Sequence, residues 1–483
     1  MPDTSRCTIV LFGNDLRVDD LPALDKACQR ADAVIPLFVQ DTARAGDWAP
    51  GGASLWWRHH ALVALDDALQ ARGSRLILRN GDTLEHVQAI VDEHDCDAIH
   101  FTRRYEPWAV ALQKDIHDTF ASDTFTVKRC AGALLFEPED VRTGSGDAYK
   151  VFTPMWRAMQ ELPPPREPLK APDKVPAPER WPKSEALDDW GLLPTSPDWA
   201  GGLRETWTPG PEGAQARLTW FCKNALETYA SDRDRPDKDG TSGLSPFLHS
   251  GNISPNRCWY DVLRYREDHP ATENGAQAFL RELGWREFSH QLLTMAPGLP
   301  DQAFKSAYDA FPWDPKKGHL KAWQRGQTGF PIVDAGMRQL YETGWMHNRV
   351  RMIVASLLIK HLLIDWREGE AWFWDTLVDA DLANNAAGWQ WVAGSGADAS
   401  PFFRIFNPMT QGAKFDPDGD YVRRWVPELA KMPTKHLNAP WEAPADVLRK
   451  AGVKLGETYP EPLVDHKSAR NRALEAFEVV KAS

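Results

Sequence analysis

The sequence has few cysteines and no long apolar run. Its six cysteines among 483 residues never form a Cys-x-x-Cys pair, which argues against zinc ribbons and dithiol chemistry. No cysteine follows Cys258, so the C-terminal half cannot hold an iron–sulfur cluster bound by four thiolates. No apolar stretch approaches the roughly 18 residues that a membrane span needs. We therefore expect a protein without a bound metal and without contact with a membrane.

Targeting and dinucleotide-binding patterns are absent as well. Residues 1–12 show no basic region followed by a long apolar core, so we expect a cytoplasmic protein. The first apolar run leads into Gly13-Asn14-Asp15-Leu16-Arg17 and not into Gly-x-Gly-x-x-Gly, which excludes the usual phosphate loop. The net charge of −12 does not favour a nucleic-acid partner, although a local basic patch would still allow one.

Two parts of the chain have different periodicity. Short β-rich runs at 7–12, 33–39, 75–79 and 98–102 alternate with helical patterns at 21–30, 54–71, 82–93 and 108–120. This alternation predicts an α/β, Rossmann-like domain with a parallel sheet over residues 1–140. Ten of the 37 prolines lie within residues 161–200, which predicts an extended interdomain connector over 141–203. Helical spacing at 276–295, 332–340 and 345–366 predicts an all-α domain over 204–483.

Five clusters in the helical half group chemically active residue types. Residues Thr241 to Ser245 join hydroxyls and a glycine at a helix start, where N–H groups bind phosphate; taken alone, an ordinary N-cap is the preferred explanation. Glu282, Trp285 and Arg286 share one helix face, which is either a solvated salt-bridging face or a recognition surface. The third cluster places Trp345, Asn348, Arg349 and Met352 on one helix face, beside His347, for which a packed or a surface position is preferred to a catalytic one. The fourth is Asp379 to Asn385 before Trp389-Gln390-Trp391, where a capped loop is the alternative. The fifth consists of the aromatic residues around Arg404 at 401–408.

Together and in this order, the clusters resemble the DNA photolyase and cryptochrome family over essentially the whole chain. The strings that carry the resemblance are YKVFTP from Tyr149, GTSGLS from Gly240, ELGWREF from Glu282, TGWMHNRVRM from Thr343, IDWREGE from Ile364, ANNAAGWQW from Ala383 and FFRIFNPMTQG from Phe402. TGWMHNR is similar to enzymes that act on cyclobutane pyrimidine dimers, since six-four photolyases carry paired histidines there. GASLWW from Gly52 is similar to the third bacterial class, which is close to plant cryptochromes.

The resemblance implies FAD in the helical domain, fully reduced when the protein is active. By motif match its contacts would come from Tyr229, Thr241, Ser242, Gly243, Leu244, Ser245, Glu282, Arg286, Asn348, Arg351, Asp379, Asp381 and Asn385. Arg351 would pair with Asp379 beside the flavin, and Asn385 would face its redox-active nitrogen. A cation and a neutral amide suit an anionic reduced flavin. An aspartate in place of Asn385 would resemble a plant photoreceptor, so Asn385 favours repair.

The resemblance also implies a substrate, DNA that contains pyrimidine dimers, and a flipped-out dimer, a step known for photolyases as a class. Substrate contacts would come from Trp285, Trp391, Arg349, Met352, Arg404 and Gln411. Glu282 and Asn348 would hydrogen-bond to the bases. An electron relay would run through Trp389, Trp366 and Trp313, although an ordinary core position explains each tryptophan equally.

An antenna pigment would bind in the α/β domain. Glu106 follows the predicted strand at 98–102, where it would bind methenyltetrahydrofolate, with Trp48 or Trp108 as a stacking face. A deazaflavin or an empty site stays open, and a simple loop cap explains the carboxylate as well.

The sequence therefore suggests three functions. The preferred one is light-driven repair of pyrimidine dimers by a monomeric enzyme, which we expect to be associated with the nucleoid when it is bound to DNA. A cryptochrome-type blue-light photoreceptor is the alternative, against which Asn385 and the short tail after the last predicted helix count. A general electron-transfer flavoprotein is weaker, because it would not need the surface of Trp285 and Trp391.

Overall fold

The computed structural model describes residues 6–398 and 403–482, which pack into two units. The first unit comprises Met1–Tyr149, Thr153–Asn224 and Ser242–Pro297. The second comprises Lys150–Phe152, Ala225–Thr241 and Gly298–Ser483. The chain therefore passes between the units several times. The domain boundaries at 140 and 203 are inferred from composition, and they stay a prediction.

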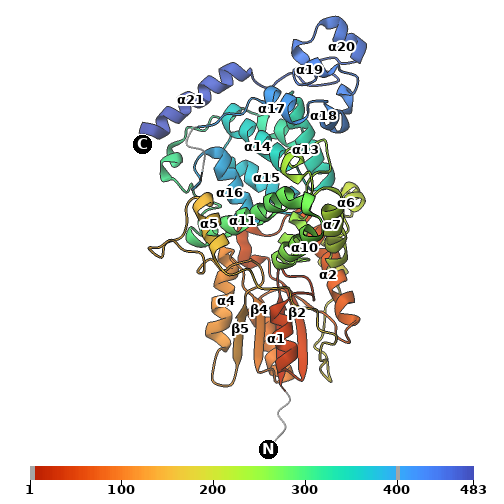
Figure 1. Cartoon of the computed structure of the whole chain (residues 1–483), viewed down its shortest axis with the longest axis vertical. Helices are drawn as coiled ribbons and strands as arrows, with labels where there is room; N and C mark the ends of the chain where they lie inside the picture. The colour runs from red at the N-terminus through yellow and green to blue at the C-terminus, as the bar shows by residue number, and fades with distance from the viewer. Residues whose placement is uncertain (1–5, 399–402, 483) are drawn as a thin grey trace, which may run out of the picture. The chain divides into compact units, whose positions relative to one another are not determined.

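A five-stranded parallel sheet forms the base of the first unit, in the order β3-β2-β1-β4-β5 (Figure 1). β1 (Cys7–Phe12), β2 (Ala33–Gln40), β3 (Ile77–Asn80) and β4 (Ala98–Thr102) lie where strands are predicted. The pattern misses β5 (Thr126–Cys130), because four of its five side chains are wholly or partly exposed at the sheet edge and form no apolar run. The predicted α/β fold class of this part is confirmed.

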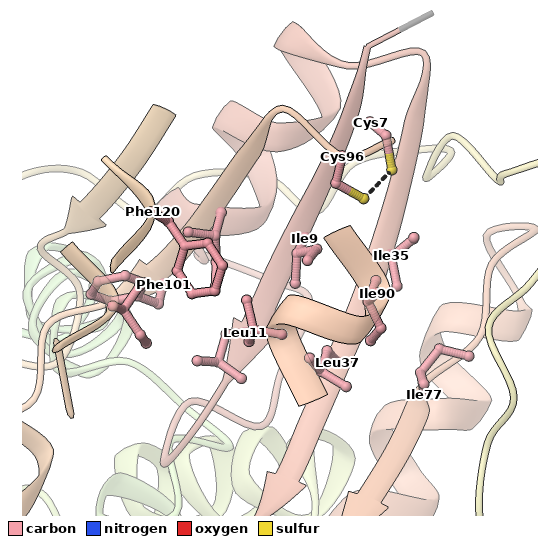
Figure 2. Packing of buried hydrophobic residues seen from close by; sticks show 13 residues of the cluster. Cys7, Ile9, Leu11, Ile35, Leu37, Ile77, Ile90, Cys96, Phe101 and Phe120 are labelled. Atoms are coloured by element: carbon pink, nitrogen blue, oxygen red, sulfur yellow. Dashed lines mark hydrogen bonds between the residues drawn. The ribbon is translucent and has the colours of Figure 1, made fainter. Parts of the chain in front are cut away.

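Buried aliphatic side chains of neighbouring strands form the core of the sheet (Figure 2). Ile9 and Leu11 of β1 stand in register with Ile35 and Leu37 of β2, and all four are buried. At one end of this core the sulfur atoms of Cys7 and Cys96 lie 2.7 Å apart as free thiols. Because these strands are buried, their sequences are continuous apolar runs, and such runs are recognisable without a structure.

Helices connect the strands, and the remaining helices of the first unit follow the sheet along the chain (Figure 1). α1 packs against β1 and β4. The elements are α1 (Pro22–Arg30), η1 (Ala43–Trp48), α2 (Gly52–Gln70), α3 (Thr83–His94), α4 (Pro107–Phe120), α5 (Phe152–Glu161), η2 (Leu187–Trp190), α6 (Gly201–Thr206), α7 (Pro211–Asn224), α9 (Ser245–His249), α10 (Pro255–Asp268), η3 (Pro270–Thr272) and α11 (Glu273–Met295).

The proline-rich segment runs extended after α5, as its prolines require. It is bound to the sheet and its helices by backbone hydrogen bonds: the amide of Val34 donates to Pro176 O at 2.8 Å, and that of Glu185 donates to Leu78 O at 3.0 Å. The segment therefore packs as part of the first unit.

Within its described residues the second unit is helical (Figure 1), and the predicted all-α character of this part is confirmed. Its elements are α8 (Tyr229–Asp232), η4 (Ser306–Ala310), α12 (His319–Gln324), α13 (Pro331–Thr343), α14 (Asn348–Ser356), η5 (Leu357–His361), α15 (Trp366–Thr376), α16 (Leu382–Ala393), α17 (Pro408–Phe415), α18 (Asp420–Trp425), η6 (Pro427–Leu429), α19 (Thr434–Leu437), η7 (Pro440–Glu442), α20 (Ala445–Ala451) and α21 (His466–Ala482).

The single helix predicted over 345–366 is wrong. α14 begins only at Asn348, because the Nδ1 atom of His347 caps it by accepting from Arg349 N at 3.2 Å. A π-helical turn, η5, follows, and Leu363 leaves the helix with φ near +50°. Asp365 then caps α15 by accepting from Arg367 N at 3.0 Å. Local caps thus override a continuous apolar periodicity, and Trp345 lies outside the helix on which it was expected.

Among the described residues, no helix has the length and apolar character needed to cross a membrane. Nor does a group of three or more possible metal ligands come together anywhere in the described ranges.

Candidate functional site

The hydroxyl-rich segment before α9 lies against a guanidinium in the first unit. Arg217 of α7 donates from Nε to the carbonyl of Ser242 at 2.7 Å. Gly243 adopts φ +61°, and a Cβ atom there would lie 2.8 Å from the same nitrogen, so glycine is required. Leu244 occupies the N-cap position without a side-chain capping bond of its own, and the hydroxyl of Ser242 accepts from Leu244 N at 3.4 Å. Backbone amides beside a cation suit an anionic group such as a diphosphate.

One face of α11 carries Glu282, Trp285 and Arg286, all of which are partly buried. Arg286 donates from Nη1 to Ala133 O at 2.8 Å. Next to it, Glu287 accepts from the amides of Leu135 and Phe136 at 3.0 and 3.2 Å, and burial raises the pKa of its carboxyl to about 7. These bonds fix the rotation of the helix. The face is thus neither fully solvated nor fully buried.

An ion pair joins α14 of the second unit to the segment before α16. Nη2 of Arg351 donates to both carboxylate oxygens of Asp379, at 3.0 and 2.8 Å, and its Nε donates to Met346 O at 2.8 Å. The Asp379 side chain is only 4% exposed. Since a buried carboxylate needs a partner, the pair fixes a positive group at this place.

Asp381 and Asn385 lie one turn apart at the start of α16. Asp381 caps the helix by accepting from Asn384 N at 2.9 Å, so the capped-loop explanation holds for this residue. Asn385 is buried, and its Nδ2 donates to the carbonyl of Glu370 at 3.1 Å. The amide oxygen of Asn385 is thereby left as an acceptor in the second unit.

Glu370 of α15 is a functional candidate that sequence reasoning missed. Its side chain is fully buried, and neither carboxylate oxygen has a hydrogen-bond partner among the described residues. Burial raises the pKa of this carboxyl well above its usual range, with Asp301 adding to the shift. One signal was available: Trp366, Glu370, Phe373 and Leu377 follow helical spacing, so the glutamate falls within an apolar stripe.

The residues expected to contact DNA backbone share one pocket of the second unit. The pocket has a volume of about 460 Å³, and its lining includes Asp234, Arg349, Arg404, Gln411, Lys414 and Phe415. Arg349 donates from Nη2 to Asp234 Oδ1 at 2.8 Å, and its guanidinium lies 4.6 Å from the ring centre of Phe415. Met352 lies beside it, with its sulfur 3.7 Å from Arg349 Nη1. Pro401 and Phe402, which open the fifth cluster, lie outside the described residues.

His347 and Asn348 occupy the turn before this pocket. His347 is buried, which lowers the pKa of its imidazole to about 4, so the ring is neutral at pH 7 and can accept at Nδ1. It is thus a capping residue in a packed position, which is one of the two positions expected for it. Asn348 is the first residue of α14, and its side chain is exposed.

Trp389, Trp366 and Trp391 lie on α16 and α15 of the second unit. Trp389 and Trp366 are buried, and Trp391 is partly buried. The ring centre of Trp389 lies 5.0 Å from that of Phe373 and 6.2 Å from that of Trp323. Trp323 is not among the residues that the sequence motifs indicate. Trp313 is partly exposed and packs at 4.4 Å from Phe311. The relay through Trp389, Trp366 and Trp313 stays a prediction.

Glu106 follows β4 at the C-terminal edge of the sheet, as expected. It occupies the N-cap position of α4 without a capping bond to that helix. Its carboxylate instead accepts from Arg104 Nη2 at 2.8 Å and from Tyr105 N at 3.2 Å. Nearby, burial and Arg104 lower the pKa of Arg58 to about 10. The surroundings of Glu106 are therefore charged and partly buried. They do not determine which antenna pigment binds there.

With the fold and these residues in place, comparison with known proteins defines the class. Residues 8–177 match the model of the DNA photolyase domain, and residues 279–479 match that of the FAD binding domain of DNA photolyase. This chain belongs to the DNA photolyase family, as its sequence motifs predict.

Similarity extends over the whole chain. The chain is 51% identical to the deoxyribodipyrimidine photo-lyase of Agrobacterium fabrum over 98% of both chains. It is 36% identical to cryptochrome-1 of Arabidopsis thaliana, covering 98% of this chain and 70% of the relative. Among solved structures, a bacterial class III photolyase from Agrobacterium tumefaciens matches with a TM-score of 0.96 and 49% identity, over 100% of this chain and 99% of the other.

Proposed function

We propose that this protein is a deoxyribodipyrimidine photolyase of class III, which uses light to split cyclobutane pyrimidine dimers in DNA. The observation that carries the proposal is the identity of 51% with the Agrobacterium fabrum photo-lyase over 98% of both chains. Its monomeric state and its cytoplasmic, nucleoid-associated location remain predictions of the sequence.

The residues present fit FAD. In the second unit, the partly buried pair of Arg351 and Asp379 supplies a cation, and Asn385 supplies a neutral amide whose Nδ2 donates to Glu370 O. In the first unit, Ser242 and Gly243 offer a tight turn against Arg217, which suits a diphosphate. The FAD contacts we propose are Tyr229, Thr241, Ser242, Gly243, Leu244, Ser245, Glu282, Arg286, Asn348, Arg351, Asp379, Asp381 and Asn385. When bound and fully reduced, FAD supplies the photoexcited electron for dimer splitting and recovers it afterwards.

The protein's own residues bind and orient the dimer. We assign Trp285 and Trp391 to stacking on the extruded bases, since base stacking on an aromatic ring is worth about 1–3 kcal/mol per base. Glu282 and Asn348 hydrogen-bond to the bases, Met352 contacts the lesion, and Arg349, Arg404 and Gln411 bind the flanking backbone. Asn385 keeps a neutral group where a carboxylate would add negative charge, which favours repair.

The experiment is repair of an oligonucleotide with a single thymine dimer by chemically reduced protein under blue light. The expected result is light-dependent recovery of intact thymines, and the matched dark sample should show binding without repair. Trp285→Ala should weaken dimer binding roughly tenfold to a hundredfold. Protein that retains FAD but repairs no dimers would refute the proposal.

A blue-light photoreceptor is the second candidate, favoured by the similarity to cryptochrome-1. It predicts a light-induced flavin absorbance change without dimer repair and without preferential binding of dimer-containing DNA in the dark. The same oligonucleotide assay therefore separates the two functions.

The antenna assignment is part of the proposal. We propose methenyltetrahydrofolate at Glu106, because the carboxylate lies at the C-terminal edge of a parallel sheet, where such folds place their ligands. A deazaflavin is the alternative, and reconstitution with each pigment decides between them.

A further inference from the structure

One carboxylate lies in an otherwise basic pocket of the second unit. Arg349, Arg404 and Lys414 line this pocket, and Asp234 is the one acidic residue among the described residues of its lining. Across the described part of the chain, Asp234 forms its ion pair with Arg349 alone, at 2.8 Å. Both side chains are partly buried, with exposed fractions of 40% for Asp234 and 23% for Arg349. Solvent therefore screens the attraction between these two charges less than it screens a fully exposed ion pair.

Arg349 is held in one orientation with hydrogen-bonding capacity left over. Its guanidinium lies against the ring of Phe415, and Asp234 accepts only from Nη2. Nη1 has just the weak thioether of Met352 at 3.7 Å, and Nε is buried without a partner among the described residues. Nη1, whose partner is weak, can therefore donate to a further anion in this basic pocket, and a planar guanidinium suits a phosphate.

We propose that Asp234 is a positioning residue for the DNA backbone that also lowers binding to undamaged DNA. Its carboxylate fixes the fork of Arg349 for a phosphodiester, and its negative charge offsets part of the attraction that this pocket exerts on any DNA. The inference rests on the proposed function, because it takes the phosphodiester to be that of a DNA substrate.

The electrostatics give the sign of the effect. Binding to undamaged DNA depends almost entirely on phosphate contacts, whereas dimer binding also uses base contacts. A carboxylate beside the phosphate site therefore weakens the binding of both DNAs by a similar factor, which for undamaged DNA is the larger share of the binding free energy. Loss of the Asp234 charge should raise affinity for undamaged DNA about threefold to tenfold at low salt, and this gain should shrink as salt screens the pocket.

Three variants of the whole protein with its flavin test this inference. Asp234→Asn keeps the shape and the acceptor for Arg349 but removes the charge, and Asp234→Ala removes both. Asp232→Asn is the matched control, because Asp232 pairs with Lys238 at 2.9 Å in the same segment and does not line the pocket. Dark binding to one duplex, with and without a thymine dimer, is measured at several salt concentrations.

Asp234→Asn should bind undamaged duplex about threefold to tenfold more tightly than the wild type, with a similar gain for the dimer duplex. Asp234→Ala should bind both more weakly than Asp234→Asn, since Arg349 is no longer oriented. Asp232→Asn should match the wild type. If Asp234→Asn behaves like Asp232→Asn, the charge effect is refuted, and if Asp234→Ala equals Asp234→Asn, the positioning role is refuted. Wild-type protein that does not repair the dimer under blue light would instead refute the proposed function.

Discussion

The buried carboxyl of Glu370 should make stability depend on pH in a way that one substitution removes. Neither of its oxygens has a hydrogen-bond partner among the residues that the structure describes, and burial raises its pKa well above the usual range, so the folded protein holds this proton where the unfolded chain has released it. For a group with a raised pKa in the folded state, the folded form binds more protons, so stability falls as pH rises above the unfolded pKa of about 4.3.

The size of the effect follows from linkage. Each pH unit between the unfolded and the folded pKa costs about 1.4 kcal/mol of unfolding free energy. Glu370→Gln keeps the shape of the neutral acid but cannot ionise in either state. The variant should therefore gain about 1.4 kcal/mol per pH unit relative to the wild type above about pH 4.5, until the folded carboxyl ionises.

Urea unfolding of wild type and variant from pH 4.5 to 7.5, followed by circular dichroism, measures this difference. Other titrating groups cancel, because they are the same in both proteins. Glu368→Gln is the matched control, since it makes the same substitution at an exposed position of the same helix α15. A Glu370→Gln difference that stays flat across this range would show that the folded carboxyl is ionised and would refute the reasoning.

Three further predictions concern the cofactor, the relay and the antenna. Arg351→Ala should leave the buried Asp379 carboxylate unpaired and lower the unfolding free energy by about 2–4 kcal/mol, as measured by denaturant titration. The variant should also co-purify with less FAD, as measured by flavin absorbance. An unchanged FAD content would contradict a role of Arg351 at the flavin. Trp389→Phe should abolish photoreduction of oxidised FAD while chemically reduced enzyme still repairs dimers, and loss of both activities would mean a packing defect. Glu106→Ala should weaken methenyltetrahydrofolate binding about tenfold or more in a fluorescence titration, and a wild type that binds only a deazaflavin would contradict the folate assignment.

Local sequence signals predict the sheet well where burial is complete. β1 and β4 have the same bounds as predicted, because every side chain in them is buried and the apolar runs end abruptly. β5 escapes the same reasoning, since an edge strand with exposed Lys128 and Arg129 looks like a loop. Its existence follows from pairing with β4 and not from its own residues.

Asp234 of the second unit escapes sequence reasoning for a different reason. Asp234 stands in a run of alternating charges, and such a run is typical of a solvated surface. Its partner Arg349 is 115 positions away in the sequence, so only tertiary packing brings the two side chains together. The pair of Arg351 and Asp379 is equally nonlocal, and it was expected from the family resemblance and not from spacing.

Helix caps account for the intermediate cases. His347, Asp365 and Asp381 cap α14, α15 and α16, and each cap fixes the rotation of the first turn that follows it. Asn348 and Arg349, Trp366, and Asn385 lie in or just after these first turns, so local bonds worth about 1 kcal/mol each determine which way the proposed functional side chains face. An aspartate cap is recognisable from sequence, whereas a histidine accepts at Nδ1 only in its neutral form, which burial favours for His347. The orientation of Trp366 and Asn385 is thus accessible to sequence reasoning, while that of Arg349 depends on His347 and Asp234, whose roles exist only in the folded protein.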